Sequence, residues 1–385
     1  MENISPTLKC KILLENRKKK KLPVFDGGLG ENPLPINPKI KGTLINNINK
    51  KSYTNIQGEE DFQKIIKSYY RTNIYNPIFT LVGNGLKPLI YLLLTCWTKK
   101  VIILTPCWVT YLEDVKILKK DYILVENIKE NNYHLNLKKI EETFIENPDS
   151  LLFFNNPCNP TGIVNTSIEI NYLAKLCQRY NITVFEDQIY HNMSQINTVS
   201  ITKFYDKVIL GSSLSKDWAL GGWRFGWFLF SKRLENLFLK MKSIGSSMYS
   251  CPSHFFNDVG VSAFKLLKEE PEYFNKMREY FLMIQQQVVS ELAYSKLIYS
   301  KPEGAWYIWL DFSNYKHILR KLGIKDSDDL MFYLLNNFGI ISVTGKAFGV
   351  NYLSLRVSLV KEEIIEGIKI LVKWLNNIEK YNIIL

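Results

Sequence analysis

The sequence predicts an α/β protein with two domains: a large domain built on a mostly parallel seven-stranded sheet, and a smaller α/β domain that follows it. Three observations support this prediction. The chain has 385 residues, more than one compact core usually serves, so two domains packed across a cleft are expected. Short runs rich in β-branched and aromatic residues alternate with helical stretches, a pattern typical of parallel sheets. A long amphipathic segment at 272–292 then leads out of the first domain.

The expected elements follow in order along the chain. Residues 1–48 are predicted to form an N-terminal arm that packs partly with the small domain. The arm contains the basic run Arg17–Lys21, expected to be solvated, and the glycine-rich stretch 26–33, expected to be irregular backbone. The large domain is assigned to 49–280 and the small domain to 281–385. Strands are expected at 78–82, 101–105, 122–125, 151–155, 183–186, 208–211 and 227–230, then at 305–311, 340–343 and 353–358.

Composition excludes several classes of protein. A hydrophobic fraction of 46% with 22% charged residues is ordinary for a globular chain. The net charge of +12 comes from lysines scattered over helical faces, which argues against a nucleic-acid partner. The longest apolar stretch, 89–97, is far too short for a membrane span and is expected to be a buried helix. Six cysteines without CxxC spacing argue against a disulfide framework or a bound metal such as zinc, and favour a cytoplasmic protein.

Four segments carry candidate chemistry, and their order is informative. They are NNPCNPTG at 155–162, DQIY at 187–190, SLSK at 213–216 followed by GGWRFG at 221–226, and LRVS at 355–358. The third places an amine that can form an imine beside hydroxyls and a guanidinium that can hold a phosphate. Together the segments resemble the class I and II aminotransferases, which are pyridoxal-phosphate enzymes of fold type I. The resemblance runs from about Asp26 to Ser358, most of the chain, and implies this fold and this cofactor.

Lys216 is expected to be the Schiff-base lysine, because a desolvated amine near positive charge serves both as nucleophile and as proton carrier. Ser213, Ser215 and Arg224 resemble the phosphate-binding set, since hydroxyls and a planar guanidinium match a dianion. These four residues account for one end of the cofactor and its covalent attachment.

Further phosphate donors are expected from the turn after the strand at 78–82. Gly85, Leu86 and Lys87 lie where a glycine turn leads into a helix, whose free amides favour an anion. Leu86 departs from the small or hydroxyl residues common in the family, so only backbone donation is expected there.

The resemblance assigns roles around the cofactor ring as well. Asp187 would pair with the protonated pyridine nitrogen, which keeps the ring electron-withdrawing. Tyr190 and Asn159 would hydrogen-bond the phenolic oxygen and adjust the pKa of the imine. Trp108 would stack on the face of the ring. Tyr53 would reach the phosphate of a neighbouring subunit, so a homodimer is implied.

On the substrate side, Arg356 resembles the arginine that grips the α-carboxylate through two parallel hydrogen bonds. Gly28, Leu29 and Asn159 would also contact the substrate. The implied function is an aminotransferase of amino-acid metabolism. It would move an amino group between an L-amino acid and a 2-oxo acid by a ping-pong Schiff-base mechanism, with Lys216, Asp187 and Tyr190 as its catalytic residues.

Three alternatives stay open at this point. A C–S lyase acting on sulfur amino acids, or an eliminating enzyme like aminocyclopropane-carboxylate synthase, would keep nearly all of these residues. A non-catalytic relative would have lost Lys216, Asp187 or Arg356, and none is lost. No second arginine typical of dicarboxylate-selective members is assigned. The aromatics Trp218, Trp223 and Tyr249 favour aromatic or larger apolar substrates, and serve equally well as core packing.

Overall fold

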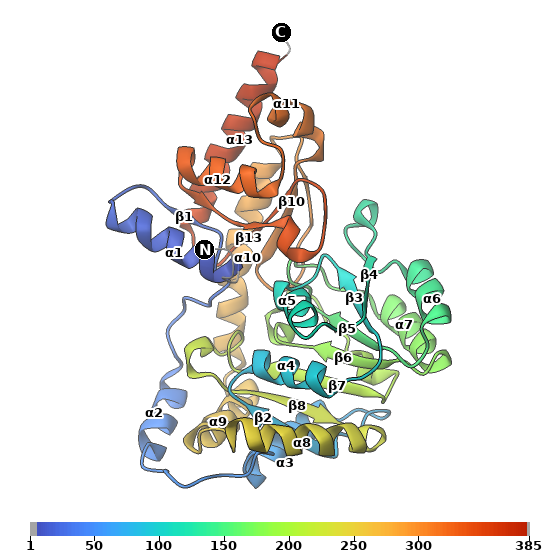
Figure 1. Cartoon of the computed structure of the whole chain (residues 1–385). Coiled ribbons are helices and arrows are strands. Elements are labelled where there is room, and N and C mark those ends of the chain that lie inside the picture. The colour runs from blue at the N-terminus through green and yellow to red at the C-terminus, as the bar shows by residue number, and fades with distance from the viewer. Residues whose placement is uncertain (1–5, 383–385) are drawn as a thin grey trace.

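The computed structural model describes residues 6–382 of the chain, so the ends of the predicted arm and small domain lie outside the described residues. A seven-stranded sheet forms the centre of the large domain, and only β8 runs antiparallel to its neighbours (Figure 1). In sheet order its strands are β2 (Phe79–Gly83), β8 (Gly226–Phe230), β7 (Val208–Ser213), β6 (Thr183–Asp187), β5 (Leu151–Asn155), β3 (Val101–Thr105) and β4 (Tyr122–Glu126). All seven strands predicted for this domain are confirmed, with ends within two residues of those expected.

Helices cover both faces of this sheet, which explains why its strands are apolar without alternation. One face carries α4 (Leu86–Cys96), α5 (Val109–Ile117) and α8 (Glu235–Tyr249). The other carries α3 (Glu60–Tyr70), α6 (Leu137–Glu146), α7 (Ser167–Arg179) and α9 (Phe255–Glu269). Successive residues of β5 point to opposite faces: Leu151 and Phe153 join the first core, and Leu152 and Phe154 the second. The helix expected at 89–97 is α4.

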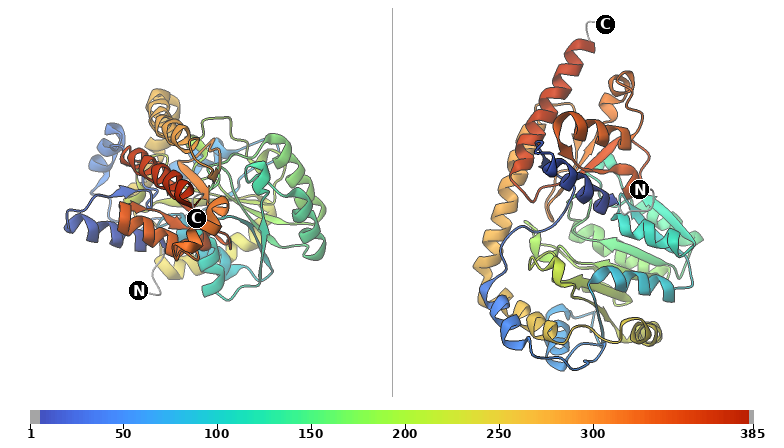
Figure 2. Two further views of the ribbon diagram at one scale, coloured as in Figure 1. Left: turned by 90° about the horizontal axis from the view of Figure 1, so that it is seen from above. Right: turned by 60° about the vertical axis from the view of Figure 1, so that its left-hand side comes forward.

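The small domain is built on a four-stranded antiparallel sheet. Its strand order is β12 (Val343–Thr344), β13 (Ser354–Ser358), β10 (Tyr307–Asp311) and β9 (Ile298–Tyr299). The helices around it are α11 (Lys316–Lys321), α12 (Ser327–Phe338) and α13 (Glu363–Asn382). The long helix α10 (Pro271–Leu292), expected at 272–292, passes from the large domain along α13, as both views of Figure 2 show.

Two details of the prediction are wrong. The single strand expected at 340–343 is two strands in different sheets, because β11 (Ile340–Ile341) pairs in parallel with β1 (Phe25–Asp26) while β12 joins the main small-domain sheet. Asp26 therefore lies in a strand rather than in irregular backbone. A two-residue strand is too short to show a periodic pattern of apolar residues in the sequence. The partner strand of β1 also lies more than 300 residues away in the chain.

The N-terminal segment divides between the two domains. Helix α1 (Pro6–Lys19) lies against β12 and projects from the molecule (Figure 1), and α2 (Pro38–Asn47) packs on α9. The basic run ends α1, where cations suit the helix dipole. In the described part of the chain, no helix is long and apolar enough to cross a membrane. Short 3-10 turns complete the chain: η1 (Lys129–Asn131), η2 (His191–Met193), η3 (Ile201–Lys203), η4 (Gly221–Trp223), η5 (Lys232–Leu234), η6 (Ser313–Tyr315) and η7 (Gly345–Phe348).

Candidate active site

A cavity of about 280 Å³ opens where the carboxyl ends of β5, β6 and β7 face the small-domain strands β10 and β13. Open α/β sheets usually bind their ligands at this edge. Most of the predicted site residues line it: Leu29, Leu86, Lys87, Trp108, Asn159, Asp187, Tyr190, Ser213, Ser215, Lys216, Arg224 and Arg356. Segments that lie far apart in the sequence therefore contribute to one site.

Three predicted residues do not line the cavity. Gly28 lies behind Arg356 and accepts a hydrogen bond from it through its carbonyl oxygen. Gly85 lies behind Arg224, so close that a Cβ at residue 85 would overlap the guanidinium. Tyr53 is 89% exposed on the surface of the protomer. Its predicted contact with a neighbouring subunit stays a prediction.

Asp187 ends β6, and both of its carboxylate oxygens have donors. The Tyr111 hydroxyl donates to Oδ2 at 2.6 Å, and the amide of Ile189 donates to Oδ1 at 3.1 Å. Burial raises the pKa of Asp187 to about 6, against the opposing effect of the Tyr111 hydrogen bond. The Tyr111 ring is itself fixed by stacking on Phe153 at 4.8 Å between ring centroids. The carboxylate is thus held in one orientation at the floor of the cavity.

Tyr190 follows β6 and meets a residue from the other domain. Its hydroxyl lies 2.7 Å from the hydroxyl of Tyr307, the first residue of β10. Burial raises the pKa of Tyr190 well above its ordinary value. Burial also opposes ionisation of Tyr307, but the positive charges of Lys216 and Arg356, together with hydrogen bonds, lower the pKa of Tyr307. The two phenols form a hydrogen-bonded pair across the domain boundary.

Lys216 lies three residues beyond the end of β7, and the N-terminal segment holds it at two points. Its ammonium donates to the carbonyl oxygen of Gly30, and its own carbonyl accepts from the Asn32 side chain at 3.0 Å. The Nζ atom also lies 5.9 Å from the Tyr190 ring centroid and 5.7 Å from that of Trp306. The amine is therefore directed into the cavity between aromatic faces.

Arg224 and the N-terminus of α4 form the cationic end of the site. The guanidinium donates to the Gly221 carbonyl at 2.8 Å and to the Asn84 carbonyl at 3.4 Å. Gly85 has a φ of 87°, a conformation that favours glycine, and α4 begins at the next residue. The first amides of a helix have no acceptor within it. Ser213 and Ser215 face this end, with the amide of Ser215 donating to the Ser213 hydroxyl at 3.2 Å.

Arg356 lies in the middle of β13 and is 2% exposed. Its guanidinium carbon lies 4.6 Å from the Tyr307 ring centroid and 5.6 Å from that of Phe348. The Nε atom is buried without a hydrogen-bond partner, and within the described chain Arg356 forms no ion pair. A buried guanidinium with an unused donor is suited to bind a carboxylate.

Asn159 is presented by the loop after β5. The loop folds back because the Asn159 amide donates to the Asn155 side chain at 2.7 Å, and Asn155 donates to the Asp187 carbonyl at 2.9 Å. The side-chain oxygen of Asn159 is buried without a partner. Asn155 thus joins the Asn159 loop to the strand that carries Asp187.

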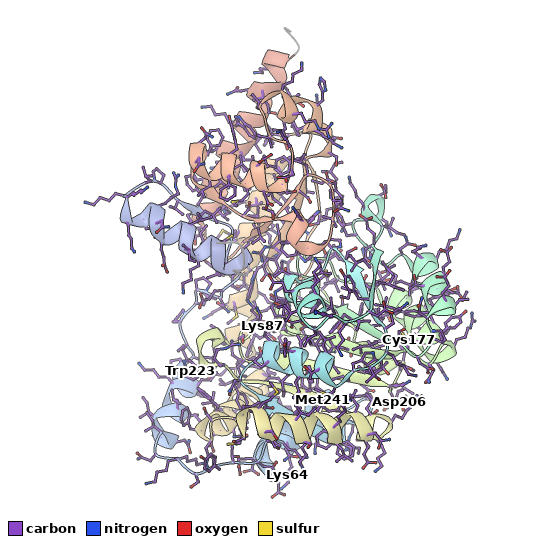
Figure 3. All side chains as sticks on the ribbon, in the orientation of Figure 1. Lys64, Lys87, Cys177, Asp206, Trp223 and Met241 are labelled. Carbon is purple, nitrogen blue, oxygen red and sulfur yellow. The ribbon has the colours of Figure 1, made fainter. Side chains whose placement is uncertain are left out.

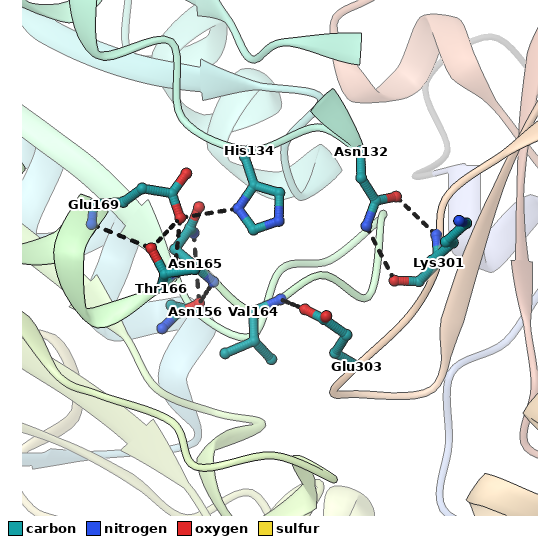
Figure 4. Close-up of polar contacts among 9 residues, drawn as sticks. All are labelled: Asn132, His134, Asn156, Val164, Asn165, Thr166, Glu169, Lys301 and Glu303. Carbon is teal, nitrogen blue, oxygen red and sulfur yellow. Dashed lines mark hydrogen bonds and ion pairs between the residues drawn. The ribbon is translucent and has the colours of Figure 1, made fainter. Parts of the chain in front are cut away.

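Small-domain residues brace the same loop, as Figure 4 shows. Glu303 accepts from the Val164 amide at 3.4 Å. A different loop of the large domain also contacts the small domain, because Asn132 makes paired hydrogen bonds with the backbone of Lys301, at 3.3 Å and 2.8 Å. Nearby, His134 contacts Glu169 at 3.0 Å, and this hydrogen bond raises the pKa of His134. The loop that carries Asn159 is therefore supported from both domains.

Trp108 caps the N-terminus of α5 and lies beside Lys87. The Lys87 ammonium is 5.4 Å from the indole centroid, at the start of α4 on the side facing the small domain (Figure 3). Lys87 is exposed, and no carboxylate of the described residues lies within ion-pair distance of it. Glu113 and Asp114 interact with its charge at longer range, and its ammonium lines the cavity where an anionic ligand could meet it.

The aromatic residues that favoured an aromatic substrate lie elsewhere. Trp218 is fully buried against Phe264, at 5.6 Å between ring centroids. Trp223 stacks on Phe256, and the Tyr249 hydroxyl donates to a backbone carbonyl of β2 at 2.9 Å. None of the three lines the cavity. These residues serve core packing, so the inference toward aromatic substrates loses its basis.

Sequence reasoning missed several residues of the site. Tyr111, Tyr307 and Asn155 contact the predicted residues directly, and Gly30 and Glu31 line the cavity. Tyr111 had a usable signal, because it follows Trp108 by three residues and falls on the same helical face. Tyr307 had none, because it reads as one more residue of an apolar strand.

The residues of the cavity fit pyridoxal phosphate. The unpartnered side-chain oxygen of Asn159 leaves an acceptor for a ligand donor, and the unpartnered Nε of Arg356 leaves a donor for a carboxylate. The glycine turn at 85 leaves space for the Arg224 guanidinium beside the free amides of α4. The carboxylate of Asp187 and the amine of Lys216 face the same space. The fold and these residues define a pyridoxal-phosphate-dependent transferase of fold type I.

Comparisons with known proteins extend this classification. The family model described as Aminotransferase class I and II matches residues 37–368. An aspartate aminotransferase of Sulfolobus acidocaldarius is 26% identical over 382 residues, covering 94% of this chain and 92% of that protein. One of Bacillus subtilis is 29% identical over 290 residues, covering 71% and 70%. The structure of the Thermus thermophilus aspartate aminotransferase with maleate superposes with a TM-score of 0.87 at 19% identity, covering 98% and 97% of the chains.

The chain belongs to the class I and II aminotransferase family. It is an aminotransferase that moves an amino group between an L-amino acid and a 2-oxo acid.

Proposed function

We propose that this chain binds pyridoxal phosphate in the cavity and uses a dicarboxylic L-amino acid, with L-aspartate as the main donor. The observation that carries the proposal is the convergence of Lys216, Asp187, Arg224 and Arg356 on one cavity. The bound cofactor would supply an electron-withdrawing ring that stabilises negative charge at the substrate Cα. Everything else in the reaction falls to the side chains of the protein.

Each part of the cofactor has a matching group in this arrangement. Arg224, Ser213, Ser215 and the first amides of α4 would hold the phosphate. Asp187 would hold the pyridine nitrogen in its protonated form. Asn159 and Tyr190 would donate to the phenolic oxygen, and Trp108 would cover one face of the ring.

Lys216 and Arg356 would act on the substrate. The guanidinium of Arg356 would bind the α-carboxylate and so fix the orientation of Cα. The Nζ atom of Lys216, directed into the cavity by the Gly30 carbonyl, would take the proton from Cα and would later deliver it to the C4′ atom of the cofactor. Leu29 would cover the substrate from the N-terminal segment.

The charge of the cavity favours a second carboxylate on the substrate. Its lining holds four cationic side chains, Lys87, Lys216, Arg224 and Arg356, against two carboxylates, those of Asp187 and Glu31. Lys87 is the one cation without a role in the scheme above, and its ammonium lies beside Trp108 at the rim. We therefore assign Lys87 to the distal carboxylate. The names of the relatives, several of them aspartate aminotransferases, support the same donor.

The test is a donor panel without any oxo acid. The purified protein, loaded with pyridoxal phosphate, is mixed separately with aspartate, glutamate, phenylalanine, tyrosine and cysteine, and the absorbance of the bound cofactor is followed. Aspartate is expected to exceed phenylalanine in kcat/KM by at least about tenfold, a difference of about 1.4 kcal/mol. Lys87→Met should lower the aspartate value by about tenfold and leave phenylalanine nearly unchanged.

Two controls complete this design. Lys116→Met removes an exposed lysine of α5 that does not line the cavity, and should leave every donor unchanged. Lys216→Ala should retain the cofactor and lose turnover by about 10⁴-fold or more. Phenylalanine ahead of aspartate would contradict the substrate assignment. Release of ammonia and pyruvate, with the cofactor absorbance unchanged, would show an elimination instead of a transfer.

We further propose a cytoplasmic homodimer. Cys96, Cys107, Cys158, Cys177 and Cys251 are free thiols, which suits a reducing compartment. Tyr53 is 89% exposed, as expected of a side chain that contributes to the site of a second copy.

A further inference from the structure

We propose that Tyr307 is a positioning residue of this site. Its hydroxyl donates a hydrogen bond to the Tyr190 hydroxyl, so that Tyr190 donates its own proton to the phenolic oxygen of the cofactor. The inference rests on the proposed function, because it requires the cofactor to lie against Tyr190. It assigns to the small domain a part in setting the protonation state of the bound cofactor.

The contact is short, buried and made across the domain boundary. The two hydroxyl oxygens are 2.7 Å apart, and the rings meet edge to face at 5.6 Å between centroids. Tyr190 is 3% exposed and Tyr307 is 1% exposed, so water does not replace the contact. Gly30 lies against the Tyr307 hydroxyl so closely that a Cβ at residue 30 would overlap it. The glycine therefore permits the Tyr307 hydroxyl to reach Tyr190.

The direction of this hydrogen bond follows from the surrounding charges. Three charged groups face the pair: Lys216 after β7, Arg356 of β13 and Asp187 of β6. The positive charges of Lys216 and Arg356 favour the ionised form of Tyr307, whereas burial and the negative charge of Asp187 disfavour the ionised form of Tyr190. The more acidic phenol is the better donor, so Tyr307 donates and Tyr190 accepts. Each phenol has one proton, and that of Tyr190 remains free for the cavity.

The hydroxyl and the ring of Tyr307 have separable roles. The ring lies under Arg356, with the guanidinium carbon 4.6 Å from its centroid. Replacement by phenylalanine keeps that ring and removes only the hydroxyl. The variant Tyr307→Phe therefore tests the proposed hydrogen bond without displacing the substrate-binding arginine.

The experiment is a pH titration of the absorbance of bound pyridoxal phosphate in wild-type protein and in Tyr307→Phe. Accepting a hydrogen bond makes the Tyr190 hydroxyl a stronger donor. Without Tyr307, the phenolic oxygen of the cofactor is hydrogen-bonded less strongly and holds the neighbouring proton to higher pH. The midpoint is expected to rise by about half to one pH unit.

Further variants show whether Tyr307 acts through Tyr190. Tyr190→Phe should shift the midpoint at least as far, and the double variant should shift it no further than Tyr190→Phe alone. Gly30→Ala should raise the midpoint too, because the new Cβ displaces the Tyr307 hydroxyl. Tyr205→Phe removes a buried hydroxyl that donates to the Ile182 carbonyl at 2.6 Å, outside the cavity, and should leave the midpoint unchanged.

The outcomes separate this inference from the proposed function. Wild-type protein that shows no absorbance of bound cofactor overturns both. A normal wild-type titration with an unmoved midpoint in Tyr307→Phe and in Gly30→Ala overturns the inference alone. Additive shifts in the double variant also overturn it, because Tyr307 would then act independently of Tyr190.

Discussion

The protonation state of the Asp187 carboxylate, which we propose pairs with the cofactor, depends on a tyrosine. Burial raises its pKa to about 6, and the hydrogen bond from Tyr111 works against a larger rise. The ionised form, which would pair with a protonated pyridine nitrogen in the proposed site, is therefore present above about pH 6 and lost as the pH falls through that value. Cofactor affinity is expected to decline along the same curve.

Replacing Tyr111 by phenylalanine should shift this curve to higher pH. The ring keeps its stacking on Phe153, and only the donor to the charged carboxylate is lost, which costs about 1.5 kcal/mol or more. The dissociation constant of pyridoxal phosphate at pH 7 should rise about threefold to tenfold, with a smaller change at pH 8.5. Affinity measured between pH 5.5 and 8.5 checks this result.

The matched control is Tyr249→Phe, which loses a hydroxyl that donates to the Val82 carbonyl instead of to a carboxylate. It should leave the pH dependence of cofactor binding unchanged. A Tyr111→Phe variant with the wild-type midpoint would show that the hydrogen bond does not set the state of Asp187.

Individual residues were predictable from the sequence where they stand in ordered short motifs. Lys216, Asp187 and Arg356 were placed in one site in advance, and the cavity brings them together. Tyr111 could be placed only through its helical spacing from Trp108, and Tyr307 could not be placed at all, because its partner Tyr190 lies 117 residues away. A contact at such separations leaves no periodic or local signal when only one sequence is read.

Among the elements, the turn from β2 into α4 requires glycine at residue 85 for two reasons: the backbone conformation and the closeness of Arg224. Gly85 has a φ of 87°, and a Cβ there would overlap the Arg224 guanidinium. Its ψ of 174° also places Gly85 in a region that is essentially restricted to glycine, so Gly85→Ala should lower the free energy of unfolding by about 1–3 kcal/mol. It should also raise the dissociation constant of pyridoxal phosphate by about tenfold or more, because Arg224 is displaced from the phosphate.

Gly323→Ala is a matched control for this prediction. Gly323 has a φ of 81°, but a Cβ at residue 323 would meet no atom within 4 Å. The substitution should cost a similar stability and leave cofactor affinity unchanged, as thermal unfolding and a binding titration will show. Equal cofactor affinity in the two variants would mean that Gly85 serves only the backbone.

Long helices and strands were predicted from the sequence more accurately than short ones. The seven strands of the large sheet and helix α10 were expected close to their observed bounds, because buried strands and long amphipathic helices carry strong patterns. Strands β1, β9, β11 and β12 have two residues each and exist through their partners. The predicted division at residue 280 stays a prediction, and this residue lies inside the continuous helix α10.

For the whole molecule, the N-terminal segment determines how the site is assembled. The carbonyl oxygens of Gly28 and Gly30 accept from Arg356 and Lys216, one cation from each domain. The same segment continues toward Tyr53, whose ring is exposed on the protomer. If Tyr53 serves the phosphate of a second copy, each site is built from two chains and the protomer alone is incomplete.

Hybrid dimers test this proposal directly. Tyr53→Ala and Lys216→Ala variants are each expected to be defective, the second one fully. In a hybrid, the site with an intact Lys216 receives Tyr53 from the other chain and should be whole. Random mixing makes about half of the dimers hybrids, each with one intact site of two, so activity should recover to about a quarter of the wild-type value.

Recovery in the mixture depends on exchange between subunits, so the variants are mixed by co-expression and hybrids are isolated with two different tags. Mixing Lys216→Ala with Arg224→Ala is the control, because both residues line the same cavity within one chain. Its hybrid has no intact site and should stay inactive. If activity recovers only in the mixture that contains Tyr53→Ala, the Tyr53 side chain acts in the neighbouring site. If activity recovers in neither mixture, Tyr53 acts only within its own protomer.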